Sequence, residues 1–130
     1  DRLLTDPSVG VCSDGSISGF HPRGHGTFAK IIEKYVVQEK LLKLEEAVRK
    51  MTSFSANVLG IHDRGTLEVG MKADINIFEP NNVRALATYP NPFVLAEGFD
   101  IVLVNGKKAW QDQNQSQQLW GRVLRPENIR

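Results

Sequence analysis

The sequence predicts an α/β fold in which a strand, a glycine-rich loop and helices come before an antiparallel β region. Three observations support this prediction. Apolar residues recur at helical spacing between residues 28 and 60. Beyond residue 65, apolar and polar residues alternate as they do in strands. Asn105-Gly106 separates two strand-like segments and predicts a hairpin with a type I′ turn.

The composition is that of an ordinary globular domain. The chain has 130 residues, of which 41% are hydrophobic. A net charge of +1 gives no field that favours nucleic acid or a membrane surface, and no apolar run approaches the length of a membrane span. Cys12 is the single cysteine, and the N-terminus lacks the form of a signal peptide, so we expect a cytoplasmic protein.

The first part of the chain predicts a buried strand followed by an irregular loop. The apolar segment "SVGVC", residues 8–12, predicts the strand, and Asp14 lies just beyond its end. Helix-breaking residues in the loop argue against a helix there: Pro22, Gly24 and Gly26. Thr27 is the expected cap of a helix over residues 28–38.

Two further helices are predicted before the β region. The segment 42–52 carries a repeated apolar face, and its acidic residues favour the first turn. Residues 53–61 predict a short helix with Ser53 as the cap and Gly60 as the stop. The polar segment "QDQNQSQQ", residues 111–118, is expected to be an exposed loop.

Several segments, in order, resemble the C-terminal part of the N-acyl-D-amino-acid deacylases, or D-aminoacylases, of the metal-dependent amidohydrolase superfamily. "KMTSFSANVLGI" and "GTLEVGMKADINIF" are similar to segments found in many amidohydrolases. "SDGS" followed by "HPRGHGTF" narrows the resemblance to the D-aminoacylase branch. The resemblance covers nearly the whole chain.

The resemblance implies a fold that the chain only partly contains. Family members are (β/α)8 barrels with a small β-sandwich built from both chain ends. Residues 1–62 would then be the end of the barrel, comprising its last strand and closing helices, and residues 63–130 the C-terminal strands of the sandwich. The rest of the barrel is expected on the same or another chain, upstream of a sequence that lacks an initiator Met.

The resemblance also implies a function. The parent enzyme would cleave the amide bond of a small-molecule substrate, an N-acyl-D-amino acid, to a carboxylate and a free D-amino acid, using one or two Zn2+ ions. Assembly into a homo-oligomer stays open. Two alternatives remain: a truncated, non-catalytic domain, and another cyclic-amide amidohydrolase of the dihydroorotase or hydantoinase type.

Asp14 is the candidate catalytic residue. A barrel builds its active site at the C-terminal ends of its strands, which is where Asp14 would lie. By resemblance it would act as general base and acid near the metal, and it is a candidate metal ligand. The alternative is a plain turn residue, because Asp before Gly is common in turns.

Arg23 and His21 are the candidate substrate-binding residues. A guanidinium can hold the free carboxylate of an amino acid through two parallel hydrogen bonds. The alternative for Arg23 is pairing with a nearby acid that orders the loop. The resemblance places His21 on the substrate side, and the alternative for it and for His25 is a loop histidine bonded to backbone.

The metal ligands are incomplete in this sequence. The family's metal site needs a His-x-His pair after the first barrel strand, and the sequence contains none. Asp14 alone cannot hold a catalytic metal ion, because several ligands are required. We therefore expect the remaining ligands upstream of this chain, and expect this segment alone to hold no Zn2+ and to be inactive.

Overall fold

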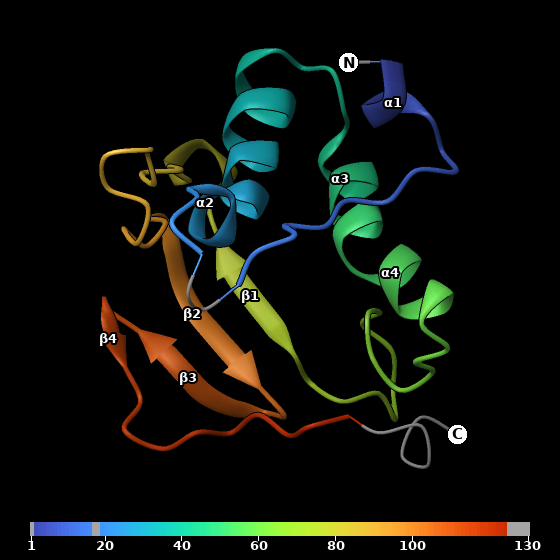
Figure 1. Ribbon diagram of the computed structural model, residues 1–130. Helices are drawn as coiled ribbons and strands as arrows, with labels where there is room; N and C mark the ends of the chain where they lie inside the picture. The colour runs from blue at the N-terminus through green and yellow to red at the C-terminus, as the bar shows by residue number, and fades with distance from the viewer. Residues whose placement is uncertain (1, 17–18, 125–130) are drawn as a thin grey trace.

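The computed structural model describes residues 2–16 and 19–124. Residues 1, 17–18 and 125–130, which fall in the predicted ranges 1–62 and 63–130, lie outside the described residues. A layer of helices packs against a small antiparallel sheet (Figure 1). None of the helices in the described part of the chain is long and apolar enough to cross a membrane.

The helices between residues 23 and 58 come before the antiparallel strands, as the sequence predicts, and a short helix at residues 80–82 lies between the first two strands. The helices are α1 (Arg2–Thr5), α2 (Arg23–Lys30), η1 (Ile31–Gln38), α3 (Leu44–Met51), α4 (Ser53–Val58) and η2 (Pro80–Asn82). The strands are β1 (Ile75–Phe78), β2 (Phe99–Val104), β3 (Lys107–Gln111) and β4 (Asn114–Gln115).

Helix α2 begins earlier than the sequence predicts. The prediction that the loop's proline and glycines prevent a helix is wrong, because the helix starts at Arg23 with Pro22 as its N-cap residue. Proline is tolerated there since its missing N–H would have no partner in the first turn. Thr27 therefore lies inside the helix, where its Oγ1 donates to the Arg23 carbonyl at 2.9 Å instead of capping. The helix continues into η1, whose turns have the wider π geometry.

The next two helices are confirmed, although α3 begins later and α4 ends earlier than the predicted ranges. In α3 the first turn carries Glu45 and Glu46, as predicted, and Ala47 is fully buried. The cap of α4 is wrong, since Thr52 occupies the N-cap position and Ser53 is the first helical residue. Gly60, with φ = 70°, follows the helix end as predicted, because glycine adopts the left-handed region without steric cost.

The sheet has the order β1-β2-β3-β4, and all its neighbours are antiparallel. The predicted hairpin is confirmed: Asn105 and Gly106 join β2 to β3 with φ of 51° and 75°. The prediction of a plain loop at residues 111–118 is wrong in part. Strand β4 pairs there with the end of β3, with Trp110 opposite Gln115.

The predicted strand at residues 8–12 is absent from the sheet. A strand needs a neighbouring strand to complete its hydrogen-bond ladder, and this segment contacts a helix instead. The Val11 N–H donates to the Lys50 carbonyl of α3 at 3.1 Å. Cys12, expected to be buried in that strand, is exposed.

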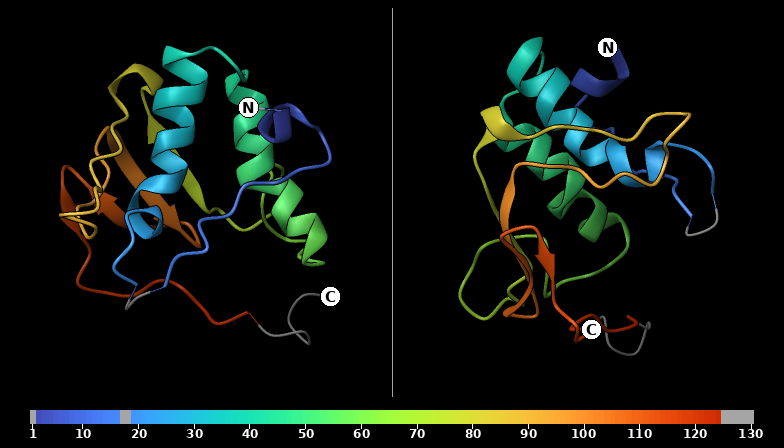
Figure 2. Two further views of the ribbon diagram at one scale, coloured as in Figure 1. Left: turned by 45° about the horizontal axis from the view of Figure 1, so that its top comes forward. Right: turned by 90° about the vertical axis from the view of Figure 1, so that its left-hand side faces the viewer.

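Two apolar clusters hold the layers together. One joins the α2–η1 helix to the sheet side and contains Ala29, Ile32 and Val83, with Phe78 and Phe99 packed against it. The other joins η1 to α3 and contains Ile31, Leu42 and Ala47. Partly buried Met51 of α3 packs against both clusters, and α3 lies beside the α2–η1 helix in the helix layer, as Figure 2 shows.

Candidate functional site

Asp14 lies in a tight turn between the N-terminal segment and α2. Its φ is 46°, in the left-handed region that Asp tolerates better than most side chains. The Gly15 N–H donates to the Ser13 hydroxyl at 3.2 Å, which closes the turn. The Asp14 side chain is 77% exposed, so its carboxylate is accessible to a ligand from outside this chain.

Arg23, at the start of α2, binds Asp14 at two points. Its Nε donates to the Asp14 carbonyl at 2.9 Å, and its Nη2 lies 2.8 Å from carboxylate Oδ2. The alternative to substrate binding by Arg23 is an ion pair with a nearby acid. That ion pair is present in this structure. Exposed ion pairs of this kind contribute only about 0–1 kcal/mol. The Arg23 guanidinium is therefore not committed to Asp14 by a strong ion pair.

His21 lies just before α2 and uses both ring nitrogens. The Arg23 N–H donates to Nδ1 at 3.1 Å, which satisfies one of the free N–H groups at the helix start. Since Nδ1 accepts, the neutral ring carries its proton on Nε2, which lies 3.1 Å from the Tyr89 hydroxyl. The sequence leaves two roles for His21, substrate binding and a contact with the backbone, and the contact with the backbone is present.

His25 lies inside α2 and packs edge-on against Phe93, with ring centroids 5.8 Å apart. Phe20 approaches the same Phe93 ring at 5.3 Å. The spacing of four residues does not make His21 and His25 a metal pair, because Nδ1 of His21 already accepts from backbone. The aromatic contacts instead join residues 20–25, which lead into α2, to the segment at residues 88–93.

The donor set of the described residues does not fit a metal ion. Among residues 2–16 and 19–124, no three His, Cys, Asp or Glu side chains come together as a ligand group. Asp14 is the candidate ligand, and the group nearest its carboxylate is the cationic guanidinium of Arg23. A metal held at Asp14 would need its other donors from residues outside the described ones.

A groove of about 510 Å³ opens beside Arg23, between the α2–η1 helix and the segment at residues 85–89. Its basic and polar lining includes His21, Arg23, Thr27, Lys30, Lys34 and Tyr89. Sequence reasoning missed Tyr89, which is 68 positions from His21. No periodicity or motif in the sequence relates these two positions.

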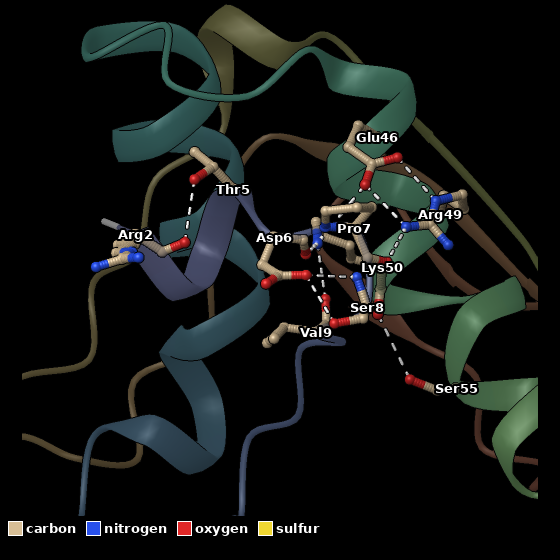
Figure 3. Close-up of polar contacts among 10 residues, drawn as sticks. All are labelled: Arg2, Thr5, Asp6, Pro7, Ser8, Val9, Glu46, Arg49, Lys50 and Ser55. Atoms are coloured by element: carbon tan, nitrogen blue, oxygen red, sulfur yellow. Dashed lines mark hydrogen bonds and ion pairs between the residues drawn. The ribbon is translucent and has the colours of Figure 1, made fainter.

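Buried Lys50 of α3 holds the segment that leads to Asp14 (Figure 3). Its side chain is fully buried, and its Nζ donates to the carbonyl of Val9 at 2.7 Å and to that of Asp6. The neighbouring Arg49 donates to the Pro7 carbonyl at 2.9 Å. The N-terminal segment is thus fixed to α3 by side-chain donors. Sequence reasoning missed this, because a lysine in an amphipathic helix is ordinarily solvated.

Glu46 completes this cluster on the same helix. Its carboxylate accepts from Arg49 Nε at 2.7 Å and from Arg49 Nη2 at 2.8 Å, and lies 3.6 Å from Lys50 Nζ. The hydrogen bonds from Arg49, followed by the charges of Arg49 and Lys50, lower the pKa of Glu46 to about 2 against the partial opposition of burial. The same contact raises the pKa of Arg49.

Comparison with known proteins gives consistent matches. The model of the family described as "Amidohydrolase family" matches residues 2–108. An N-acyl-D-aspartate deacylase of Alcaligenes xylosoxydans xylosoxydans is 36% identical over 97% of this chain and 26% of its own length. An N-acyl-D-glutamate deacylase of the same organism is 41% identical over 95% of this chain and 26% of its own length.

A solved structure matches at the level of the fold. The crystal structure of N-acyl-D-glutamate deacylase from Bordetella bronchiseptica, complexed with zinc and a phosphonate inhibitor that mimics the tetrahedral intermediate, superposes with a TM-score of 0.80. It is 36% identical, and the match covers 85% of this chain and 24% of that one. The chain therefore spans about a quarter of the length of the relatives it matches.

Proposed function

The chain belongs to the amidohydrolase family, and from this premise we propose that it is the C-terminal part of a metal-dependent hydrolase that cleaves N-acyl-D-amino acids. The products are a carboxylate and a free D-amino acid. The observation that carries the proposal is the contact of the Arg23 guanidinium with the Asp14 carboxylate at 2.8 Å. It puts a carboxylate-binding group and a proton acceptor side by side. The names of the two deacylase relatives that match 95–97% of the chain support the same chemistry.

In the proposed site Arg23 binds the α-carboxylate of the substrate. The guanidinium offers two parallel N–H donors, which suit a carboxylate better than a point charge does. To do so, Arg23 releases the exposed Asp14 carboxylate and binds the substrate carboxylate in its place. This exchange costs little free energy, because an exposed ion pair is weak. Substrate binding then leaves the Asp14 carboxylate free to act.

Asp14 moves the proton in this proposal. Its carboxylate accepts a proton from the attacking water and returns it to the nitrogen of the leaving amine. The turn at φ = 46° and the backbone contact from Arg23 Nε to the Asp14 carbonyl hold the residue in place when its carboxylate is released. The same residue can thus be bound through its backbone while its side chain reacts.

Zinc is the metal we propose for the whole enzyme, on the strength of the related zinc-complexed structure. A bound zinc ion supplies Lewis-acid polarisation of the amide carbonyl and of the attacking water. The described residues do not form its site, so in this proposal the ligands beyond Asp14 come from outside the described residues.

We further propose that residues 1–62 close a (β/α)8 barrel and that residues 63–130 belong to a β-sandwich. An open apolar groove between the helices and β1 supports this arrangement. It is lined by Phe28, Ile32, Val48, Leu67, Phe78 and Phe99, among others. In a complete protein, an apolar surface of this kind is expected to be buried against another part of the protein.

The test is a substrate panel with the full-length protein. N-acetyl derivatives of D-amino acids, their L-enantiomers, dihydroorotate and hydantoin are supplied, and amine release or ring opening is followed. We expect hydrolysis of the D-series, loss of activity with a chelator and its return with Zn2+. Turnover of the cyclic amides alone would replace this proposal with the cyclic-amide alternative. A full-length protein that binds no metal and hydrolyses none of the panel would make the non-catalytic reading correct.

A further inference from the structure

The start of α2, where Arg23 lies, is braced by the segment at residues 84–97 on both sides of that residue. Before Arg23, the His21 ring packs edge-on against Tyr89, with centroids 5.0 Å apart, and Nε2 lies 3.1 Å from the Tyr89 hydroxyl. After it, His25 packs against Phe93. The segment runs alongside the start of α2, as the right-hand view of Figure 2 shows.

The bracing segment is itself fixed to the rest of the fold. Its two ends are paired, because Arg84 and Glu97 exchange backbone hydrogen bonds of 3.2 Å and 3.1 Å. Thr88 and Asn91 exchange two more, both 3.1 Å, which close the turn that carries Tyr89. Tyr89 therefore lies in a hydrogen-bonded turn, within a segment whose two ends are also hydrogen-bonded to each other.

We infer that Tyr89 is a positioning residue for Arg23 and acts through His21. This inference rests on the proposed function, in which Arg23 binds the substrate carboxylate. The Tyr89 hydroxyl accepts from Nε2 and fixes the orientation of the His21 ring. The oriented ring presents Nδ1 to the Arg23 N–H at the first residue of α2. The backbone of Arg23, from which the guanidinium extends, is then held by a residue of the β part of the chain.

Two substitutions separate the parts of this contact. Tyr89→Phe keeps the aromatic packing on His21 and removes the hydroxyl. His21→Asn keeps an acceptor for the Arg23 N–H, because Asn side chains cap helix starts, but it cannot reach Tyr89. Tyr35→Phe is the matched control, since the Tyr35 hydroxyl has no hydrogen-bond partner among the described residues.

The experiment is a double-mutant cycle in the full-length enzyme, with KM and kcat measured on an N-acetyl-D-amino acid and on its carboxamide. We expect each single variant to raise KM for the acid about threefold to tenfold, the scale of one neutral hydrogen bond, with little change in kcat. The double variant should match the singles, because both remove the same contact. Tyr35→Phe should leave KM unchanged.

Additive losses in the cycle, or a Tyr89→Phe enzyme with normal KM for the acid, would overturn the inference. If Arg23→Lys still impaired acids more than carboxamides in that case, the proposed role of Arg23 would stand and only the Tyr89 link would fail. Equal effects of Arg23→Lys on acids and carboxamides would overturn the substrate role of Arg23, and the inference with it.

Discussion

Arg23 holds Asp14 by its backbone as well as by its side chain, since Nε donates to the carbonyl at 2.9 Å while Nη2 pairs with the carboxylate at 2.8 Å. Under the proposed function, the two contacts differ in what a substrate can displace. A competing carboxylate replaces the ion pair, whereas the backbone contact can persist. This separation allows one arginine to keep the turn ordered and still bind a ligand.

Asp14→Asn tests the proton-transfer role in the complete enzyme. Asparagine preserves the size of the side chain and tolerates the left-handed turn, but it cannot accept the proton. We expect kcat to fall at least about a hundredfold with the fold intact, as for loss of a general base. Asp112→Asn is the control, because Asp112 has a similar φ of 51° in the turn between β3 and β4. Near-normal kcat for Asp14→Asn would make Asp14 a turn residue only.

Arg23→Lys tests the proposed binding of the substrate carboxylate by Arg23. Lysine keeps the charge but loses the two parallel donors, so we expect KM for N-acyl-D-amino acids to rise roughly tenfold to a hundredfold. KM for the matched carboxamide substrates should change much less, because these substrates carry no carboxylate for the guanidinium to bind. Steady-state kinetics on the two substrate series provide the measurement. A uniform loss on both series would contradict the assignment.

Glu46→Gln tests the charge cluster of α3 through its pH dependence. Because the folded pKa of Glu46 is about 2, below its ordinary value of 4.5, the ionised carboxylate stabilises the fold above pH 4.5. That contribution is lost as the pH falls from about 4.5 to about 2. The melting temperature of Glu46→Gln should therefore lie below the wild-type value at pH 6 and converge with it near pH 2. Glu45→Gln, in the same turn but exposed, is the control, and a difference independent of pH would contradict the cluster's role.

Lys50→Met tests the buried anchor of the N-terminal segment. Methionine fills a similar volume but leaves the Asp6 and Val9 carbonyls without their donor. We expect a loss of about 1–3 kcal/mol in the free energy of unfolding, measured by denaturant titration. Lys43→Met, at the exposed N-cap position of α3, should have a much smaller effect. A Lys50→Met protein as stable as wild type would show that apolar packing replaces these bonds fully.

The 130-residue chain expressed alone should be poorly soluble or should pair with a second copy. Large apolar side chains are exposed on it, including Phe20 at 80% and Leu67 at 80%. The groove between the helices and β1 adds a further uncovered apolar surface. Light scattering after size exclusion gives the mass in solution. A monodisperse monomer that unfolds cooperatively would contradict this expectation.

The sequence by itself determined the features that depend on short stretches of chain. Asn105-Gly106 predicts its turn correctly, because both residues accept positive φ whatever surrounds them. The helical spacing of residues 44–51 predicts α3 for the same local reason. The motifs around Asp14 and Arg23 indicated the deacylase branch, to which the two matched relatives belong by name. The catalytic and binding roles of these residues stay predictions.

Only the tertiary structure decided which residues meet. The strand expected at residues 8–12 depends on neighbouring strands, and here its backbone binds α3 instead. Pairing of Arg23 with Asp14, burial of Lys50 and the contact of His21 with Tyr89 join residues 9, 41 and 68 positions apart. Local propensity and periodicity specify the conformation of a segment and the face it buries. They do not specify the partner on that face, because the partner is set by how the layers pack against one another.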